Sequence, residues 1–99
     1  MNEVCLTLLS PPEIEESLLD ELLMNPTIKM FTSQRAARHG GHLAGLDPRE
    51  QVLGRSDAVL IQALLNTRDA EELLAGLRAR FRASGVQFWM VPVLGQGEL

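Results

Sequence analysis

Residues 57–65 constrain the fold more than any other segment, because both alternating sets of their side chains are apolar. Successive side chains of a strand point to opposite faces of its sheet. One set includes Leu60 and Leu64, and the other includes Val59 and Ile61. The strand predicted here therefore needs apolar contacts on both of its faces.

An amphipathic helix is predicted to follow a first strand at residues 3–9. Ser10 is the expected N-cap, Pro11 needs no amide hydrogen at the first helical position, and Glu13 stands at capping-box spacing. The Asn-Pro pair at 25–26 ends the helix. The apolar residues at helical spacing are Ile14, Leu18, Leu19, Leu22 and Leu23.

A second helix is predicted from Asn66 or Thr67, either of which could serve as its N-cap, to about Arg82. The remaining segments with strand character are residues 27–34 and 86–94. The order strand, helix, strand, strand, helix, strand predicts an α+β ferredoxin-like β-α-β-β-α-β sandwich. This fold is a four-stranded antiparallel sheet with two helices on one face. Pro92 lacks an amide donor, so the last strand is expected at an edge or a bend. The apolar residues of the second helix are Ala70, Leu73, Leu74, Leu77 and Phe81.

The second face of this sheet has no helix to cover it. We expect Val59, Ile61 and Val91 to lie on that face. Soluble monomers rarely expose a contiguous apolar surface of this kind. The pattern therefore predicts association of the chain with copies of itself, unless the leucine-rich strands merely reflect composition.

Composition narrows the class of protein. The 99 residues are enough for one small domain, residues 1–99. A net charge of −4 argues against nucleic acid as a partner. We expect no signal peptide at Met1 and no direct membrane insertion, since no apolar run is long enough to cross a bilayer. Cys5, the one cysteine, is expected to be inert and buried. A single cysteine excludes a disulfide framework, which favours a cytoplasmic location.

A long loop is predicted between the second and third strands, at residues 35–56. We expect it to be mobile, because it contains four glycines and Pro48 and shows no sustained hydrophobic period. Its net charge is +2, whereas the rest of the chain carries −6. A basic loop on an acidic body favours an anionic ligand or an acidic patch on a partner, although a merely solvated loop is the alternative. The candidate residues are Arg35, Arg38, Arg49 and Arg55.

Two histidines within this loop are the candidate metal ligands. His39 and His42 flank two glycines and lie near Asp47 and Glu50 in the sequence. Imidazole binds zinc, copper and nickel well, but a tight site needs three or four ligands. Solvated histidines are the alternative. No catalytic set of residues is identifiable, so the chain is predicted not to be an enzyme.

The sequence resembles the PII-like superfamily of small signalling proteins over nearly its whole length. It is most similar to an uncharacterised proteobacterial PII-like family that is associated with heavy-metal efflux systems. No single motif carries this resemblance; it rests on the order and spacing of short segments. The segments are Phe31-Thr32-Ser33, Arg38-His39-Gly40, Gly45-Leu46, Glu50-Gln51-Val52, Gly54-Arg55, residues 77–81, Phe88-Trp89 and Val91-Pro92-Val93.

The resemblance implies a homotrimer that buries the second sheet face, with ligands in clefts between subunits. It also implies that residues 35–56 contact a partner such as a membrane transporter or efflux component. The sequence departs from nitrogen-regulatory PII proteins in three ways. It has no tyrosine, so their tyrosyl modification cannot occur. Its turn at 83–85 is too short for their phosphate-binding segment, and its tail after Leu94 has no basic residue to hold a triphosphate. We therefore do not expect ATP to bind in the usual PII manner, and a divalent transition metal or a smaller anion is the candidate ligand. The resulting hypothesis is a non-enzymatic trimeric regulator linked to heavy-metal resistance or transport, and the alternative is a metal-ion binding or buffering protein.

Overall fold

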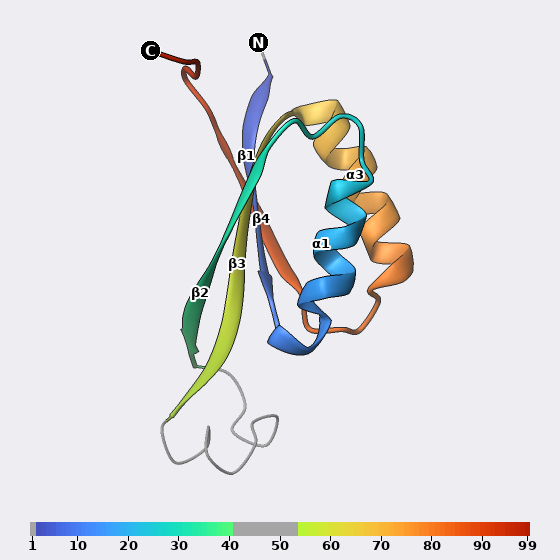
Figure 1. Ribbon diagram of the computed structural model, residues 1–99, viewed down its shortest axis with the longest axis vertical. Helices are drawn as coiled ribbons and strands as arrows, with labels where there is room; N and C mark the ends of the chain where they lie inside the picture. The colour runs from blue at the N-terminus through green and yellow to red at the C-terminus, as the bar shows by residue number, and fades with distance from the viewer. Residues whose placement is uncertain (1, 41–53) are drawn as a thin grey trace.

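The computed structural model describes residues 2–40 and 54–99 as a four-stranded antiparallel sheet with its helices on one face (Figure 1). The strand order is β2-β3-β1-β4. The ferredoxin-like prediction is confirmed, and Pro92 lies on an edge strand as expected. The elements are β1 (Glu3–Ser10), the 3₁₀ helix η1 (Pro12–Ile14), α1 (Glu15–Leu23), β2 (Phe31–His39), β3 (Arg55–Asn66), α3 (Thr67–Arg80) and β4 (Gln87–Pro92). In this part of the chain, no helix is long and apolar enough to cross a membrane.

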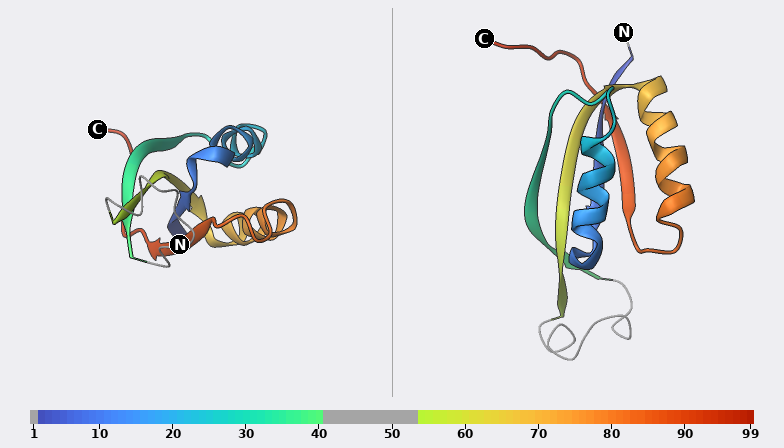
Figure 2. Two further views of the ribbon diagram at one scale, coloured as in Figure 1. Left: turned by 90° about the horizontal axis from the view of Figure 1, so that it is seen from below. Right: turned by 45° about the vertical axis from the view of Figure 1, so that its right-hand side comes forward.

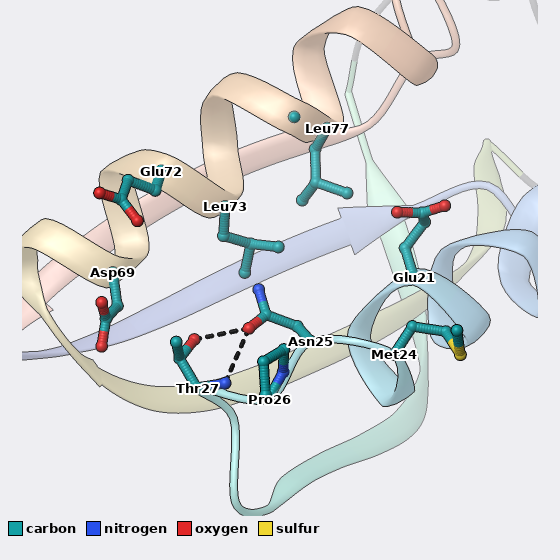
Figure 3. A pocket seen from close by; sticks show the side chains of 10 residues that line it. Glu21, Met24, Asn25, Pro26, Thr27, Asp69, Glu72, Leu73 and Leu77 are labelled. Atoms are coloured by element: carbon teal, nitrogen blue, oxygen red, sulfur yellow. Dashed lines mark hydrogen bonds between the residues drawn. The ribbon is translucent and has the colours of Figure 1, made fainter.

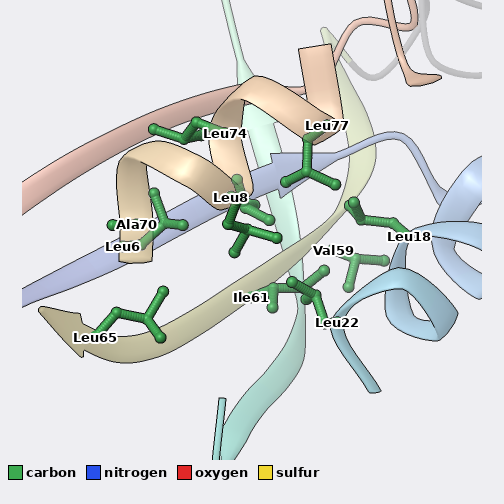
Figure 4. Close-up of a cluster of buried hydrophobic side chains, with 11 residues drawn as sticks. Leu6, Leu8, Leu18, Leu22, Val59, Ile61, Leu65, Ala70, Leu74 and Leu77 are labelled. Carbon is green, nitrogen blue, oxygen red and sulfur yellow. The ribbon is translucent and has the colours of Figure 1, made fainter. Parts of the chain in front are cut away.

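The hydrophobic core lies between the sheet and the two α-helices (Figure 4). Val59 and Ile61 belong to it, each about 1% exposed, so placing them on the uncovered face was wrong. Because side chains of a strand alternate, a strand that is apolar on both sides leaves open which set faces the helices. The buried core residues are Leu6, Leu8, Leu18, Leu22, Val59, Ile61, Leu65, Ala70, Leu73, Leu74 and Leu77.

The start of the first helix differs from the prediction. Ser10 is still part of β1, and its hydroxyl donates to the carbonyl oxygen of Pro11 at 2.8 Å instead of capping a helix. A 3₁₀ turn then precedes α1, whose first residue is Glu15. Of the predicted apolar stripe, Leu18 and Leu22 are buried whereas Leu23 is 70% exposed.

Both ends of the predicted long loop belong to strands, because β2 and β3 extend into it. Arg35, Arg38 and His39 belong to β2, and Arg55 belongs to β3. The exposed, polar end of this ribbon has no apolar alternation, so periodicity alone could not mark it as strand. Residues 27–30 form a turn instead of strand, in which Asn25 Oδ1 accepts from the Thr27 amide and hydroxyl. His42 and Arg49 lie outside the described residues.

The N-cap of helix α3 is Asn66, one of the two residues predicted for this position. Asn66 Oδ1 accepts a hydrogen bond from the Asp69 amide at 2.8 Å. The predicted apolar residues Ala70, Leu73 and Leu77 are buried against the sheet. The helix ends at Arg80, two residues earlier than expected, and Ala83 beyond it takes a positive φ of 58°.

The Asn66 cap gives a first testable prediction. We expect Asn66→Ala to lower the free energy of unfolding by about 1 kcal/mol, because the Asp69 amide loses its acceptor. Asn66→Ser is the matched control, since serine is also a good N-cap. Urea denaturation of both variants at one protein concentration measures the difference. Equal losses in the two variants would contradict a role for this hydrogen bond.

Candidate functional site

The sheet has its helices on one side only (Figure 2). Its opposite face carries half-exposed apolar side chains, and we call it the open face. Cys5 lies in the middle of one row, opposite Leu64 on β3 and Val91 on β4. Leu64 is 42% exposed and Val91 is 48% exposed, while Cys5 is partly buried. In the next row Trp89, 45% exposed, lies opposite Thr7. The prediction of an uncovered apolar face is thus confirmed, with different β3 residues on it.

Polar contacts cross the open face only at its centre in the described part of the sheet. Thr7 is 2% exposed, and its hydroxyl accepts a hydrogen bond from the Gln62 amide at 3.5 Å. Leu60 and Leu9 are opposite each other in the following row and are partly buried. A surface that is apolar at this density is typical of an interface between protein chains.

The candidate basic residues lie where β2 ends and β3 begins, at the end of the molecule opposite both termini (Figure 1). Cross-strand pairing places His39 opposite Arg55, and Arg38 opposite Ser56. Alternation along the strands puts Arg35, His39 and Arg55 on the helical side of the ribbon and Arg38 on the other side. The sequence analysis treated these basic residues as one group, whereas the strands place Arg38 on one face of the ribbon and the other three on the opposite face.

The environment of His39 bears on the predicted metal site. The residue opposite it is a cation, Arg55, and both side chains are exposed. A nearby guanidinium disfavours a bound metal cation and favours an anion. Within the described residues no group of three metal-binding side chains occurs. His42, the second predicted ligand, lies outside those residues, so the metal hypothesis stays a prediction.

Arg78 and Arg80, in the last turn of α3, already have partners. The Arg80 guanidinium forms an ion pair with Glu21 of α1, which joins the two helices. The Arg78 guanidinium lies over the Phe88 ring, 5.3 Å from its centroid. These contacts assign both side chains to the packing of α3 against its neighbours.

A groove between α1 and α3 was not predicted from the sequence (Figure 3). Its lining comes from two segments about 45 residues apart, and neither contains a known binding motif. The one signal in the sequence was Gly76, a glycine inside a helix with no turn to require it.

Solved PII-like and CutA proteins share the fold of this chain. CPII from Thiomonas intermedia is a nitrogen regulatory PII-like protein that was solved bound to ADP, AMP and bicarbonate. It shows 17% identity and a TM-score of 0.72 over 97% of this chain and 96% of that one. The periplasmic divalent cation tolerance protein CutA from Archaeoglobus fulgidus shows 8% identity and a TM-score of 0.72 over 97% and 88%. At these identities the likeness shows the fold alone.

The family is given by a match over residues 1–99 to the model described as "Protein of unknown function (DUF3240)". The chain belongs to the DUF3240 family. A solved DUF3240 family protein from Shewanella baltica has a TM-score of 0.82 and 15% identity, covering 100% of this chain and 98% of that one. Comparison with curated proteins found no match. The predicted resemblance to PII-like proteins is confirmed for the fold.

Proposed function

We propose that the chain is a non-enzymatic regulatory protein that acts as a homotrimer in the cytoplasm. The observation that carries the proposal is the open face, on which Leu64, Trp89 and Val91 are each nearly half exposed in the single chain. Packing three sheets around a common axis would bury these side chains. The number of subunits in this proposal follows from the resemblance to PII-like proteins. Burial of apolar surface on this scale is the main favourable term in most protein association.

We call the end of the β2–β3 ribbon, residues 35–39 and 55–57, the ribbon end, and it is proposed as the part that carries the signal. Its three arginines outnumber its one carboxylate, Asp57, and give it a net positive charge, whereas the chain as a whole carries −4. The arginines are Arg35, Arg38 and Arg55. A ligand bound beside these side chains would favour one arrangement of the adjoining residues, and a partner would respond to that arrangement. Following the resemblance, the proposed partner is a membrane transporter or efflux component, in the context of heavy-metal resistance.

The proposed ligand is a small anion. Of the fold neighbours, CPII was solved with ADP, AMP and bicarbonate, and this chain pairs His39 with Arg55 at the end of its ribbon. Its tail residues 95–99 carry no cation, and the Gln96 amide donates to Glu3 at 2.8 Å instead. These features support AMP or bicarbonate over a triphosphate, which needs more positive charge.

Calorimetry with AMP, sodium bicarbonate and nickel chloride tests this proposal. We expect saturable binding of one of the two anions, and a loss of at least about tenfold in affinity when Arg55→Gln removes a charge-assisted hydrogen bond. Arg68→Gln is the matched control, because Arg68 is exposed on α3 and pairs along its own helix, with Glu72. Binding of nickel that His39→Ala abolishes, with no anion bound, would contradict the proposal and favour a metal-binding protein.

A further inference from the structure

The groove between α1 and α3 lies on the helical side of the molecule, away from the open face. It has a volume of about 330 Å³ and is bounded by the end of α1, the turn that follows it, and the side of α3 that faces α1. Figure 3 shows Leu73 and Leu77 pointing down from α3 toward Asn25 and Pro26. Because the open face is on the other side of the sheet from α1 and α3, a trimer formed through that face leaves the groove accessible.

The floor of the groove is apolar. Leu73 and Leu77 are part of the core and expose only their edges, and Met24 at the rim is 83% exposed. A long, unbranched methionine side chain adapts to different apolar partners and is common at binding surfaces. The groove therefore offers apolar contact to a side chain of moderate size.

Gly76 keeps this floor open. Glycine is a less favourable residue than alanine inside a helix, and the backbone of α3 at this position has no positive φ that requires glycine. A Cβ atom added there would meet no heavy atom within 4 Å outside its own helix. Packing within residues 2–40 and 54–99 therefore does not explain the glycine, and space for another group is left against α3 at this point of the groove.

Carboxylates stand at both ends of the groove. Asp69 and Glu72 lie at one end and Glu21 at the other (Figure 3). Glu21 is neutralised by its ion pair with Arg80. Glu72 pairs with Arg68 at 3.5 Å in an exposed contact, and Asp69 makes no ion pair within residues 2–40 and 54–99. The electrostatic attraction for a bound cation is therefore strongest at the end formed by Asp69 and Glu72.

Asn25 adds a hydrogen-bond donor between these ends. Its Oδ1 is occupied by the amide and hydroxyl of Thr27, at 2.9 and 2.6 Å. These two bonds fix the orientation of the carboxamide, so that its NH₂ group points across the groove toward Leu73 (Figure 3). An amide in this orientation suits a carbonyl oxygen of a ligand.

We propose that the groove binds a short segment of a partner protein in which an arginine or lysine stands next to an apolar residue. The apolar side chain lies over Gly76 between Leu73 and Leu77, the cation reaches Asp69 and Glu72, and a backbone carbonyl accepts from Asn25. The combination of apolar floor, anionic end and amide donor matches a peptide better than a free metal ion or a polyamine, since only a peptide supplies all three partners. This site is distinct from the ribbon end and does not depend on the function proposed for it.

The test uses the capped dipeptide N-acetyl-leucyl-arginine amide, titrated into the ¹⁵N-labelled full chain and followed by amide chemical shifts. We expect saturable shifts at Asn25, Leu73 and Gly76 with a dissociation constant of about 1 mM, and no such shifts with N-acetyl-leucyl-glutamate amide. Gly76→Ala is expected to weaken binding about tenfold, because its methyl group occupies the floor. The same substitution is expected to raise the melting temperature by a few degrees, which separates lost binding from lost folding.

Gly97→Ala serves as the matched control, because Gly97 lies in the exposed tail and a Cβ atom there also meets nothing. It is expected to leave the affinity unchanged. Glu72→Gln is expected to weaken binding about threefold, because an ion pair with an exposed carboxylate contributes little binding free energy. Shifts spread over the acidic surface of α1, or equal affinities of Gly76→Ala and the unchanged chain, would overturn the proposal.

Discussion

Val91→Glu is expected to convert the proposed trimer into folded single chains. Val91 lies on edge strand β4 and is 48% exposed, so a glutamate there fits the single chain without strain. In an assembly formed through the open face, the same carboxylate would be buried without a partner in each subunit. Burying an unpaired charge lowers the stability of an assembly by about 2–5 kcal/mol. Three such charges, one in each subunit, outweigh the favourable free energy of association of a small interface.

Leu23→Glu is the control for this substitution. It adds the same charge at a leucine that is 70% exposed on α1, on the opposite side of the sheet. Sedimentation equilibrium is expected to give about three times the 10.9 kDa chain mass for the control and the unchanged protein, and one chain for Val91→Glu.

Trp89 gives an independent signal for the same change. It is the one tryptophan of the sequence, lies one row from Val91 on the open face, and is 45% exposed in the single chain. Burial in an assembly would shift its fluorescence to shorter wavelength, and Val91→Glu should reverse that shift. A Val91→Glu protein that retains three subunits would show that another surface forms the interface, and an unchanged protein that sediments as one chain would remove the trimer altogether.

The parts of the fold that depend on hydrophobic periodicity could be predicted from the sequence. The helical spacing of Ala70, Leu73 and Leu77 identified a buried helix face, and the apolar strand 57–65 required cover on both sides. Periodicity could not decide which side of that strand faces the helices, because both sets of residues are apolar. For this reason Val59 was assigned to the wrong face.

The candidate site was less predictable for two physical reasons. The ends of β2 and β3 pair through backbone hydrogen bonds, which polar residues such as Arg38 and His39 form as well as apolar ones do. The sequence therefore showed a loop where the chain has a ribbon. The groove has Asn25 and Asp69 in its lining, and only the packing of α1 beside α3 brings these two segments to one groove.

Leu18→Ala is expected to cause the largest loss of stability among single substitutions in α1. Leu18 is fully buried, and Figure 4 shows it beside Val59 and Leu77 at the junction of α1, the sheet and α3. Truncation leaves a cavity that the surrounding helices and strands fill only in part. Substitutions of this kind lower the free energy of unfolding by about 3 kcal/mol, a large part of the roughly 5–15 kcal/mol that stabilises a small domain.

Leu23→Ala separates this packing effect from helix propensity. Both substitutions replace leucine by alanine within the same nine-residue helix, so the intrinsic change in helix propensity is similar for the two. Since Leu23 is 70% exposed, its truncation should change stability by about 0.5 kcal/mol or less. Thermal unfolding at one fixed protein concentration is needed because association raises apparent stability. We expect a melting temperature lower by about 15 °C for Leu18→Ala alone; similar values for both variants would mean that α1 does not pack through Leu18.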